Sequence, residues 1–226
     1  MSTLVSNRYT LIVLACFALF VSCNNSDEHK GEKDEGVIEF VTSVIDEQHP
    51  LAMLAPKEAI LKYKHDDLLL EMSSIGFHTG VYGNLAQKSV TQTVSFLNIK
   101  QACIENSIDI AKENLDYPLI IKETKQTKKI AGLKCYRLMV TMENDTSIHF
   151  DAFYTKELGM LNCNSLTPYS SIKGVLLDYR VKRMGMEMRF LAKSVKQVAV
   201  DPEVFIVPKD LKIVTRAQME KTLNLN

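Results

Sequence analysis

Two histidine-containing groups are the first candidates for chemistry in this sequence. His149 and Asp151 are two residues apart, so on a β-strand both side chains would point to one face. A carboxylate beside an imidazole can orient it as a general base. Nothing nearby supplies a nucleophile, and the chain has neither a G-x-S-x-G motif nor a phosphate-binding P-loop. The sequence therefore predicts no catalytic residue, and we expect this pair to lie on the polar face of a strand.

The second group is His65-Asp66-Asp67, whose side chains are possible ligands of a divalent cation. Consecutive polar residues between two apolar segments are also typical of a solvated hairpin turn. We expect the turn and predict no metal site. Residues 80–83 (GVYG) match only part of a dinucleotide-binding fingerprint, so no cofactor is predicted.

Three cysteines, Cys103, Cys135 and Cys163, follow the first part of the chain. None belongs to a C-x-x-C motif, which argues against a zinc site and against thioredoxin-like chemistry. In an oxidising compartment Cys135 and Cys163 could form a disulfide bond. Three thiols leave at least one unpaired, and the alternative is that all three are free and buried.

The N-terminal segment indicates export. Arg8 precedes the apolar run 11–20 (LIVLACFALF), which is too short to span a bilayer comfortably. A positive residue, a short apolar stretch and then small residues form a secretory signal. Residues 20–23 (FVSC) resemble the lipobox of bacterial lipoproteins. The resemblance implies that residues 1–22 are a signal peptide and that Cys23 is acylated, for example with palmitate, after cleavage.

Residues 23–35 are predicted to be the lipidated cysteine and a disordered tether, since Asn24 to Glu35 (NNSDEHKGEKDE) has nothing apolar to bury. Residues 36–226 are predicted to form a single domain. Asn24 is not the aspartate that retains some lipoproteins at the inner membrane, and Asp27-Glu28 is similar to a surface-export signal. We expect a lipid anchor in the outer membrane, on its periplasmic face or at the cell surface.

Composition limits the classes of function. The chain has 226 residues, 27 Lys+Arg and 27 Asp+Glu, so its formal net charge is zero. Binding to nucleic acid requires a basic surface, and no nucleic-acid partner is predicted. A hydrophobic share of 46% is enough for a sizeable core.

The element that must position any site is the segment Ile172 to Val198, which reads as two strands joined near Gly185. Apolar and charged residues alternate along both halves, as expected for a sheet with one buried face. Glycine at the junction suits a tight turn. The inferred inward residues are Val175, Leu177, Tyr179, Val181, Met186, Met188, Phe190 and Ala192.

The remaining chain is mainly β. Strands are expected at 36–46, 59–64, 68–75, 77–82, 89–99, 119–123, 134–142 and 147–155, with a basic turn at 125–129. A stripe formed by Ile104, Ile108, Ala111 and Leu115 predicts a helix over 101–115. Capping-box spacing of Thr215 and Gln218 predicts a final helix over 216–223. The fold class is α+β, mainly β: a curved antiparallel sheet forming an incomplete barrel, with one internal and one C-terminal helix.

Four motifs carry a family resemblance. They are Lys128 to Tyr136 (KKIAGLKCY), Phe153 to Leu158 (FYTKEL), Ile172 to Tyr179 (IKGVLLDY) and Phe205 to Pro208 (FIVP). In this order they resemble a lipoprotein family of unknown function found in Gram-negative bacteria. The resemblance implies a lipoprotein-carrier-like (LolA/LolB-like) fold, in which helices close an incomplete barrel around an apolar cavity for acyl chains. It implies no catalytic residues.

Five soft apolar residues on inferred inward faces are the candidate ligand site: Met72, Tyr154, Met186, Met188 and Phe190. Methionine is flexible and polarizable, which suits a promiscuous apolar surface. These side chains either line a cavity or fill an ordinary core.

The sequence thus predicts a membrane-anchored, non-enzymatic envelope lipoprotein that binds a lipid or a lipidated partner. The alternative is a structural or assembly lipoprotein that acts through a protein–protein surface, with an envelope protein as its partner.

Overall fold

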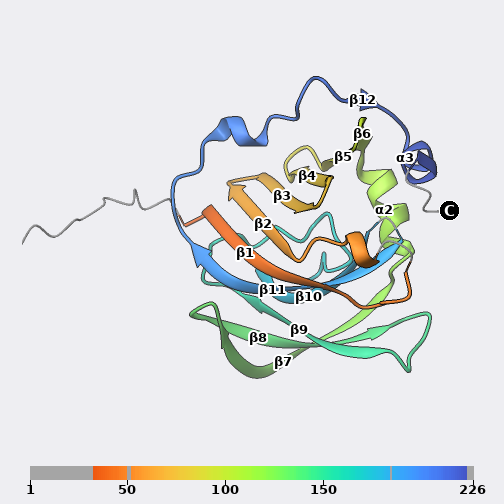
Figure 1. The fold of residues 1–226 in the computed structure, drawn as a ribbon. Helices are drawn as coiled ribbons and strands as arrows, with labels where there is room; N and C mark the ends of the chain where they lie inside the picture. The colour runs from red at the N-terminus through yellow and green to blue at the C-terminus, as the bar shows by residue number, and fades with distance from the viewer. Residues whose placement is uncertain (1–32, 50–51, 184, 223–226) are drawn as a thin grey trace, which may run out of the picture.

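The computed structural model of the protein describes residues 33–49, 52–183 and 185–222, which form one twelve-stranded sheet (Figure 1). The strand order is β12-β6-β5-β4-β3-β2-β1-β11-β10-β9-β8-β7. All neighbours are antiparallel except β12 and β6, which pair in parallel. The predicted signal peptide and Cys23 lie outside the described residues. The strands are β1 (Glu35–Val44), β2 (Glu58–Lys64), β3 (Asp67–Ser74), β4 (Phe77–Asn84), β5 (Ser89–Phe96), β6 (Ile99–Glu105), β7 (Leu119–Ile130), β8 (Leu133–Met142), β9 (His149–Thr155), β10 (Val175–Arg183), β11 (Met186–Lys196) and β12 (Lys212–Ile213).

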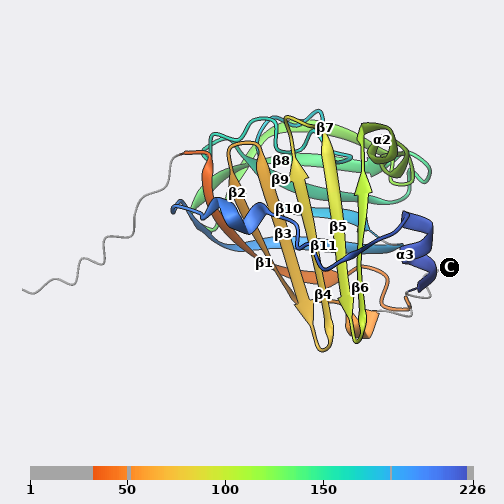
Figure 2. The same cartoon turned by 90° about the horizontal axis from the view of Figure 1, so that it is seen from above.

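The sheet is strongly curved and open. In Figure 2 strands β3 to β6 cross over strands β8 to β11, so the two halves of the sheet face each other. The terminal strands of the order, β12 and β7, do not pair, so the barrel is incomplete. Two α-helices accompany the sheet, α2 (Ser107–Leu115) between β6 and β7, and α3 (Arg216–Thr222) near the C-terminus. The predicted fold class is confirmed. Two short 3₁₀ helices complete the described elements, η1 (Ala52–Leu54) and η2 (Pro202–Phe205).

The β10–β11 hairpin lies in the middle of the sheet, and its predicted alternation is confirmed. Tyr179 is opposite Phe190 and Val181 is opposite Met188, on the inner face. On the outer face Asp178 is buried and accepts two hydrogen bonds from the Arg189 guanidinium, at 2.8 and 2.9 Å. Gly185 has a φ of 75°, a left-handed conformation that glycine adopts without strain.

The predicted start of the internal helix was wrong. Residues 99–105 form strand β6, and helix α2 begins only at Ser107. Asn106 caps this helix: its side chain accepts from the Asp109 backbone N–H, and the Asp109 carboxylate accepts from the Asn106 N–H. The stripe that predicted the longer helix is not its buried face, because Ile104, Ile108 and Leu115 are mostly exposed and Ile110 is the buried residue.

Two further boundaries differ from expectation. The basic segment 125–129 is not a turn but part of β7, which continues to Ile130 after a register shift between Glu123 and Thr127. Glu35, expected in the tether, is the first residue of β1. Its buried carboxylate accepts hydrogen bonds from Lys64 and from the Val200 backbone N–H, so it belongs to the folded domain.

Candidate ligand cavity

An apolar cavity of about 230 Å³ lies between the two halves of the sheet. Strands β2 to β5 form one wall and β10 and β11 form another. The connection between β9 and β10, residues 156–174, supplies a third wall. No Asp, Glu, Lys, Arg or His is among the described residues that line it. The main contributors are Leu61, Leu70, Met72, Val81, Met160, Cys163, Leu166, Tyr179, Val181, Met186, Met188 and Phe190.

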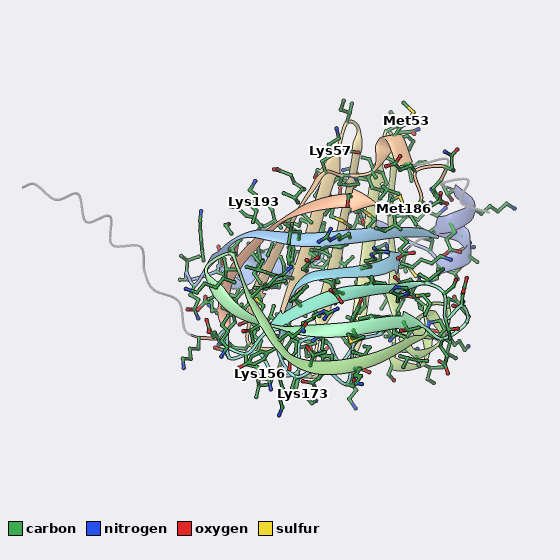
Figure 3. All side chains as sticks on the ribbon, turned by 90° about the horizontal axis from the view of Figure 1, so that it is seen from below. Met53, Lys57, Lys156, Lys173, Met186 and Lys193 are labelled. Atoms are coloured by element: carbon green, nitrogen blue, oxygen red, sulfur yellow. The ribbon has the colours of Figure 1, made fainter. Side chains whose placement is uncertain are left out.

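Four of the five predicted cavity residues lie on these walls: Met72, Met186, Met188 and Phe190. They come from β3 and β11, which are not neighbours in the sheet, so the curvature brings them together. Met186, labelled in Figure 3, is the first residue of β11. The period-two pattern of the sequence was sufficient to place them on the inner face.

Tyr154, the fifth predicted residue, is not on the cavity wall. It packs in a separate core cluster with Leu138, Tyr169 and Ile172. Its ring lies 5.7 Å from that of Tyr136, and its hydroxyl donates a hydrogen bond to Glu123. Burial and this hydrogen bond raise the pKa of Tyr154 above its ordinary value. The loop residues Tyr169 and Ile172 belong to the same buried cluster as Tyr154.

The aromatic rings of Tyr179 and Phe190 form part of the β10–β11 wall. The rings of Tyr179 and Phe190 are stacked with centroids 5.1 Å apart, and Phe40 meets both edge-on at 6.1 and 5.9 Å. Such offset and edge-to-face arrangements are the favoured geometries of aromatic pairs. This part of the wall is therefore well packed, whereas the four lining methionines, Met72, Met160, Met186 and Met188, are its adaptable part.

The three cysteines that the structure describes, Cys103, Cys135 and Cys163, are free thiols, and Cys135 and Cys163 are not bridged. The Cys163 thiol lines the cavity and donates to the Gly174 carbonyl oxygen at 3.2 Å. The Cys135 thiol is directed to the Leu133 carbonyl oxygen, at 3.6 Å. Burial raises the pKa of Cys163 to about 12 and that of Cys135 to about 11. Both thiols are protonated at neutral pH, and a protonated thiol is a poor nucleophile.

The histidine groups have ordinary structural partners. Asp151 forms an ion pair with Arg137 at 2.8 Å, and His149 Nδ1 lies 3.1 Å from the Ser147 carbonyl oxygen. His65 Nδ1 lies 2.9 Å from the Asp34 carboxylate, at the turn between β2 and β3. Over the described part of the chain, no three His, Cys, Asp or Glu side chains are grouped closely enough to hold a metal ion. Within the same residues, no helix is both long and apolar enough for a membrane span.

The sequence analysis did not predict that the loop between β9 and β10 lines the cavity. Met160, Leu166 and Tyr169 are buried and line the cavity, although they belong to no strand or helix. Large apolar residues recurring in a segment without strand periodicity were the available signal, because exposed loops rarely carry so many. Ala55 and Pro56, next to η1, also contact the cavity.

Both helices close the open side of the half-barrel. Ile110 of α2 packs on Val90 and Leu166, and Met219 of α3 packs on Val94 and Cys103. The predicted capping box of α3 is present, with Thr215 N–H donating to the Gln218 side chain at 2.9 Å.

Arg216 connects the two helices to the sheet. Its guanidinium donates to Glu105 of β6, with Nε at 2.7 Å, and to Glu113 of α2 at 2.7 and 2.8 Å. Burial alone would lower the Arg216 pKa, but the hydrogen bonds to Glu105 and Glu113 hold it above its ordinary value. We call Glu105, Glu113 and Arg216 the helix clamp.

Comparison with protein-family models and with curated protein sequences finds no match. Among solved structures, PNGF-II in a C2 crystal form is similar, with a TM-score of 0.51 and 19% identity over 84% of this chain and 32% of PNGF-II. A P21 form gives a TM-score of 0.50 and 18% identity over 83% and 32% of the two chains. This chain spans about a third of the length of PNGF-II, and the likeness shows a shared fold only.

MucB in complex with MucA(peri) is a more distant structure, with a TM-score of 0.35 and 12% identity over 82% of this chain and 58% of MucB. That similarity is too low to carry an argument. The lipoprotein family suggested by the four sequence motifs therefore stays a prediction. What the fold and the comparisons define together is an open, strongly curved β-sheet of the half-barrel type.

Proposed function

We propose that this protein is a non-enzymatic binder of a single acyl chain, carried by a lipid or by a lipidated partner. The observation that carries the proposal is the cavity of about 230 Å³ whose walls are almost entirely apolar. An engineered apolar cavity of about 150 Å³ stays dry and binds benzene. Pockets for drug-sized ligands measure about 300–1,000 Å³, so this cavity suits one chain better than a whole multi-chain lipid.

The chemistry of the walls supports binding without catalysis. A ligand in the cavity would meet no carboxylate, imidazole or amine among the described lining residues. The one thiol there, on Cys163, has its pKa raised to about 12 by burial. General acid–base catalysis needs a group with a pKa near the working pH, and nucleophilic catalysis needs an activated nucleophile.

We propose further that Cys23 anchors the protein in the outer membrane, on its periplasmic face or at the cell surface. The support is the lipobox-like segment 20–23 and the polar stretch that follows it. Each buried acyl CH₂ contributes about 0.8 kcal/mol to membrane binding, so two or three chains anchor stably. The folded domain begins close behind, with Glu35 in β1.

The second candidate is a structural or assembly lipoprotein that binds an envelope protein through its surface. One observation favours it. Met53 in η1, Ile75 in the β3–β4 turn and Leu97 in the β5–β6 turn are 98%, 96% and 80% exposed. Figure 3 shows Met53 projecting from the periphery of the molecule. We call these three residues the apolar tips; exposed apolar residues gathered at one edge commonly mark contact surfaces.

The test is uptake of a fluorescent acyl ester, methyl parinarate, by the chain from Asn24 onward, which contains every described element. We expect saturable binding with one site per chain. Gly83 lines the cavity, and an added Cβ there would lie 3.6 Å from Leu68 Cβ, an ordinary contact. Gly83→Ala should therefore bind normally, whereas Gly83→Phe should weaken binding by about tenfold because its ring occupies ligand space.

Val81→Phe is a second obstructing variant, since Val81 also lines the cavity. Far-ultraviolet circular dichroism and a denaturant midpoint would verify that each variant is folded. Absence of probe uptake by the unmodified chain would reject the acyl-binding proposal. It would leave the apolar tips as the surface to investigate, with a pull-down from envelope extracts as the next experiment.

A further inference from the structure

The cavity wall contains a polar side chain that the protein itself does not satisfy. Gln92 lies in the middle of β5, opposite Val81 on one side and Cys103 on the other. It is only 5% exposed and lines the cavity. Within the described part of the chain its amide group forms no hydrogen bond. A mostly buried glutamine without a protein partner is uncommon, and this one lines the cavity, where an atom of a ligand can reach it.

The other polar groups of the same wall have partners. The Thr79 hydroxyl donates to the Thr93 carbonyl oxygen at 2.8 Å. The Asn164 amide nitrogen donates to the carbonyl oxygens of Ile172 and Gly174, at 3.0 and 2.6 Å. The Tyr169 hydroxyl donates to the Arg180 carbonyl oxygen at 2.8 Å. Gln92 thus differs from its neighbours in having both a donor and an acceptor free toward the cavity.

The charge of the wall restricts what Gln92 can bind. No described lining residue is charged, so an ionised carboxylate would lose its hydration without gaining a counter-ion. An uncharged oxygen has no such cost. A carboxamide can donate to a carbonyl oxygen and can both donate to and accept from a hydroxyl group.

We propose that Gln92 is the specificity-determining residue of the cavity and that it hydrogen-bonds the uncharged oxygen of an acyl ester. The preferred ligand class is then a neutral, esterified acyl chain rather than a free fatty acid anion. The proposal rests on the proposed acyl-binding function and adds the chemical class of the ligand. An ester-linked chain has two sources, a glycerol ester and a diacylated cysteine, which share this chemistry.

The experiment compares three fluorescent probes with the same chain, from Asn24 onward. Methyl parinarate has an ester, parinaric acid is an anion at pH 7, and diphenylhexatriene has no oxygen. We expect the ester to bind more tightly than the anion. Gln92→Leu should weaken ester binding by about five- to tenfold, which is the size of one net hydrogen bond. Its binding of diphenylhexatriene should be unchanged or stronger.

Thr79→Val is the matched control, because the Thr79 hydroxyl lines the same cavity but is already used by Thr93. It should leave the preference for the ester intact. Since Gln92→Leu removes an unpaired buried amide, its denaturant midpoint should not fall, and this measurement separates loss of recognition from loss of folding. Competition by monoacylglycerol and by a diacylated-cysteine peptide then distinguishes the two sources of the chain.

The outcomes separate the two proposals. If none of the three probes binds, the acyl-binding function fails and this inference fails with it. If diphenylhexatriene binds and the ester has no advantage over the anion, acyl-chain binding stands and the role of Gln92 is rejected. Equal ester affinity in the unmodified chain and in Gln92→Leu would reject that role as well.

Discussion

Three tyrosine and cysteine side chains of the domain keep their protons well above neutral pH because they are buried. Burial raises the pKa of Tyr63 to about 12, of Cys163 to about 12 and of Cys135 to about 11. In each case the largest cause is burial, because the charged form would lose its hydration. For Cys163, which lines the cavity, the consequence is a wall that stays uncharged at physiological pH.

These shifts predict a loss of stability in alkali. An unfolded thiol ionises near its ordinary pKa of 9.0, whereas folded Cys163 retains its proton up to about pH 12. Between these values the unfolded state binds fewer protons, so the free energy of unfolding falls as pH rises. Cys163→Ala should flatten that decline, by at most about 1.4 kcal/mol per pH unit. Urea unfolding at several values between pH 8 and 11 would measure it, and parallel curves for both proteins would contradict the expectation.

At the scale of single elements, the sequence correctly predicted which side chains of a strand point into the domain, because a sheet with one buried face alternates apolar and polar residues. The alternation along the β10–β11 hairpin placed Met186, Met188 and Phe190 inside, and the structure has them there. The start of α2 was mispredicted because Ile104 and Ile108 share a four-residue spacing across a strand–helix junction by coincidence. Asn106 and Asp109 carried the correct local signal, a capping box.

The cavity could not be predicted from local sequence patterns. Whether inward-facing residues leave a space is decided by how the 156–174 loop packs against them. Tyr154 is packed in a core cluster with the loop residues Tyr169 and Ile172, whereas Met188 lines the cavity. The free amide of Gln92 was likewise hidden, since a glutamine among the serine, threonine and valine residues of β5 reveals nothing of its partners.

The helix clamp gives an element-scale prediction. Arg216→Met should lower the free energy of unfolding by about 2–3 kcal/mol, because it leaves Glu105 buried without a cation. The loss should be smaller than for a fully buried pair, since the Arg216 side chain is 26% exposed. Hydrogen exchange should show the largest loss of protection in α3. Arg216→Met combined with Glu105→Gln should recover part of the loss.

Lys100→Met provides the comparison for the clamp. Lys100 forms an ion pair with Asp210 at 2.7 Å, but both side chains are more than half exposed. Exposed pairs contribute little, so this change should leave the denaturant midpoint where it was. An equal effect of the two substitutions would show that burial is not what makes the clamp important.

At the scale of the whole molecule, the strand register separates two ends of the half-barrel. Glu35 begins β1 opposite Lys64, at the end where β2 turns into β3 and β4 turns into β5. Ile75 and Leu97 lie in the turns at the other end of the same strands. The N-terminal end of the domain and these apolar tips are therefore opposite one another.

The anchoring proposal is tested on the full chain in cells that process lipoproteins. The unmodified protein should sediment with membranes and partition into detergent, and Cys23→Ser should release it, because no acyl chain can then be attached. Cys103→Ser is the control for substitution of a cysteine and should remain in the membrane fraction. Retention of Cys23→Ser in membranes would count against the lipobox interpretation.

Because the two ends lie opposite one another, the length of the tether limits how far the apolar tips can lie from the membrane. If Cys23 is acylated, nine residues lie between the anchor and Lys33, and the ten Cα–Cα steps from Cys23 to Lys33 span at most about 35 Å when fully extended. An eight-residue strand such as β3 adds about 26 Å. The apolar tips would then work within about 60 Å of the bilayer that holds the protein, facing away from it. Tether length, rather than affinity, would decide which opposing surface they can touch, and lengthening residues 24–32 would extend that radius without altering the domain.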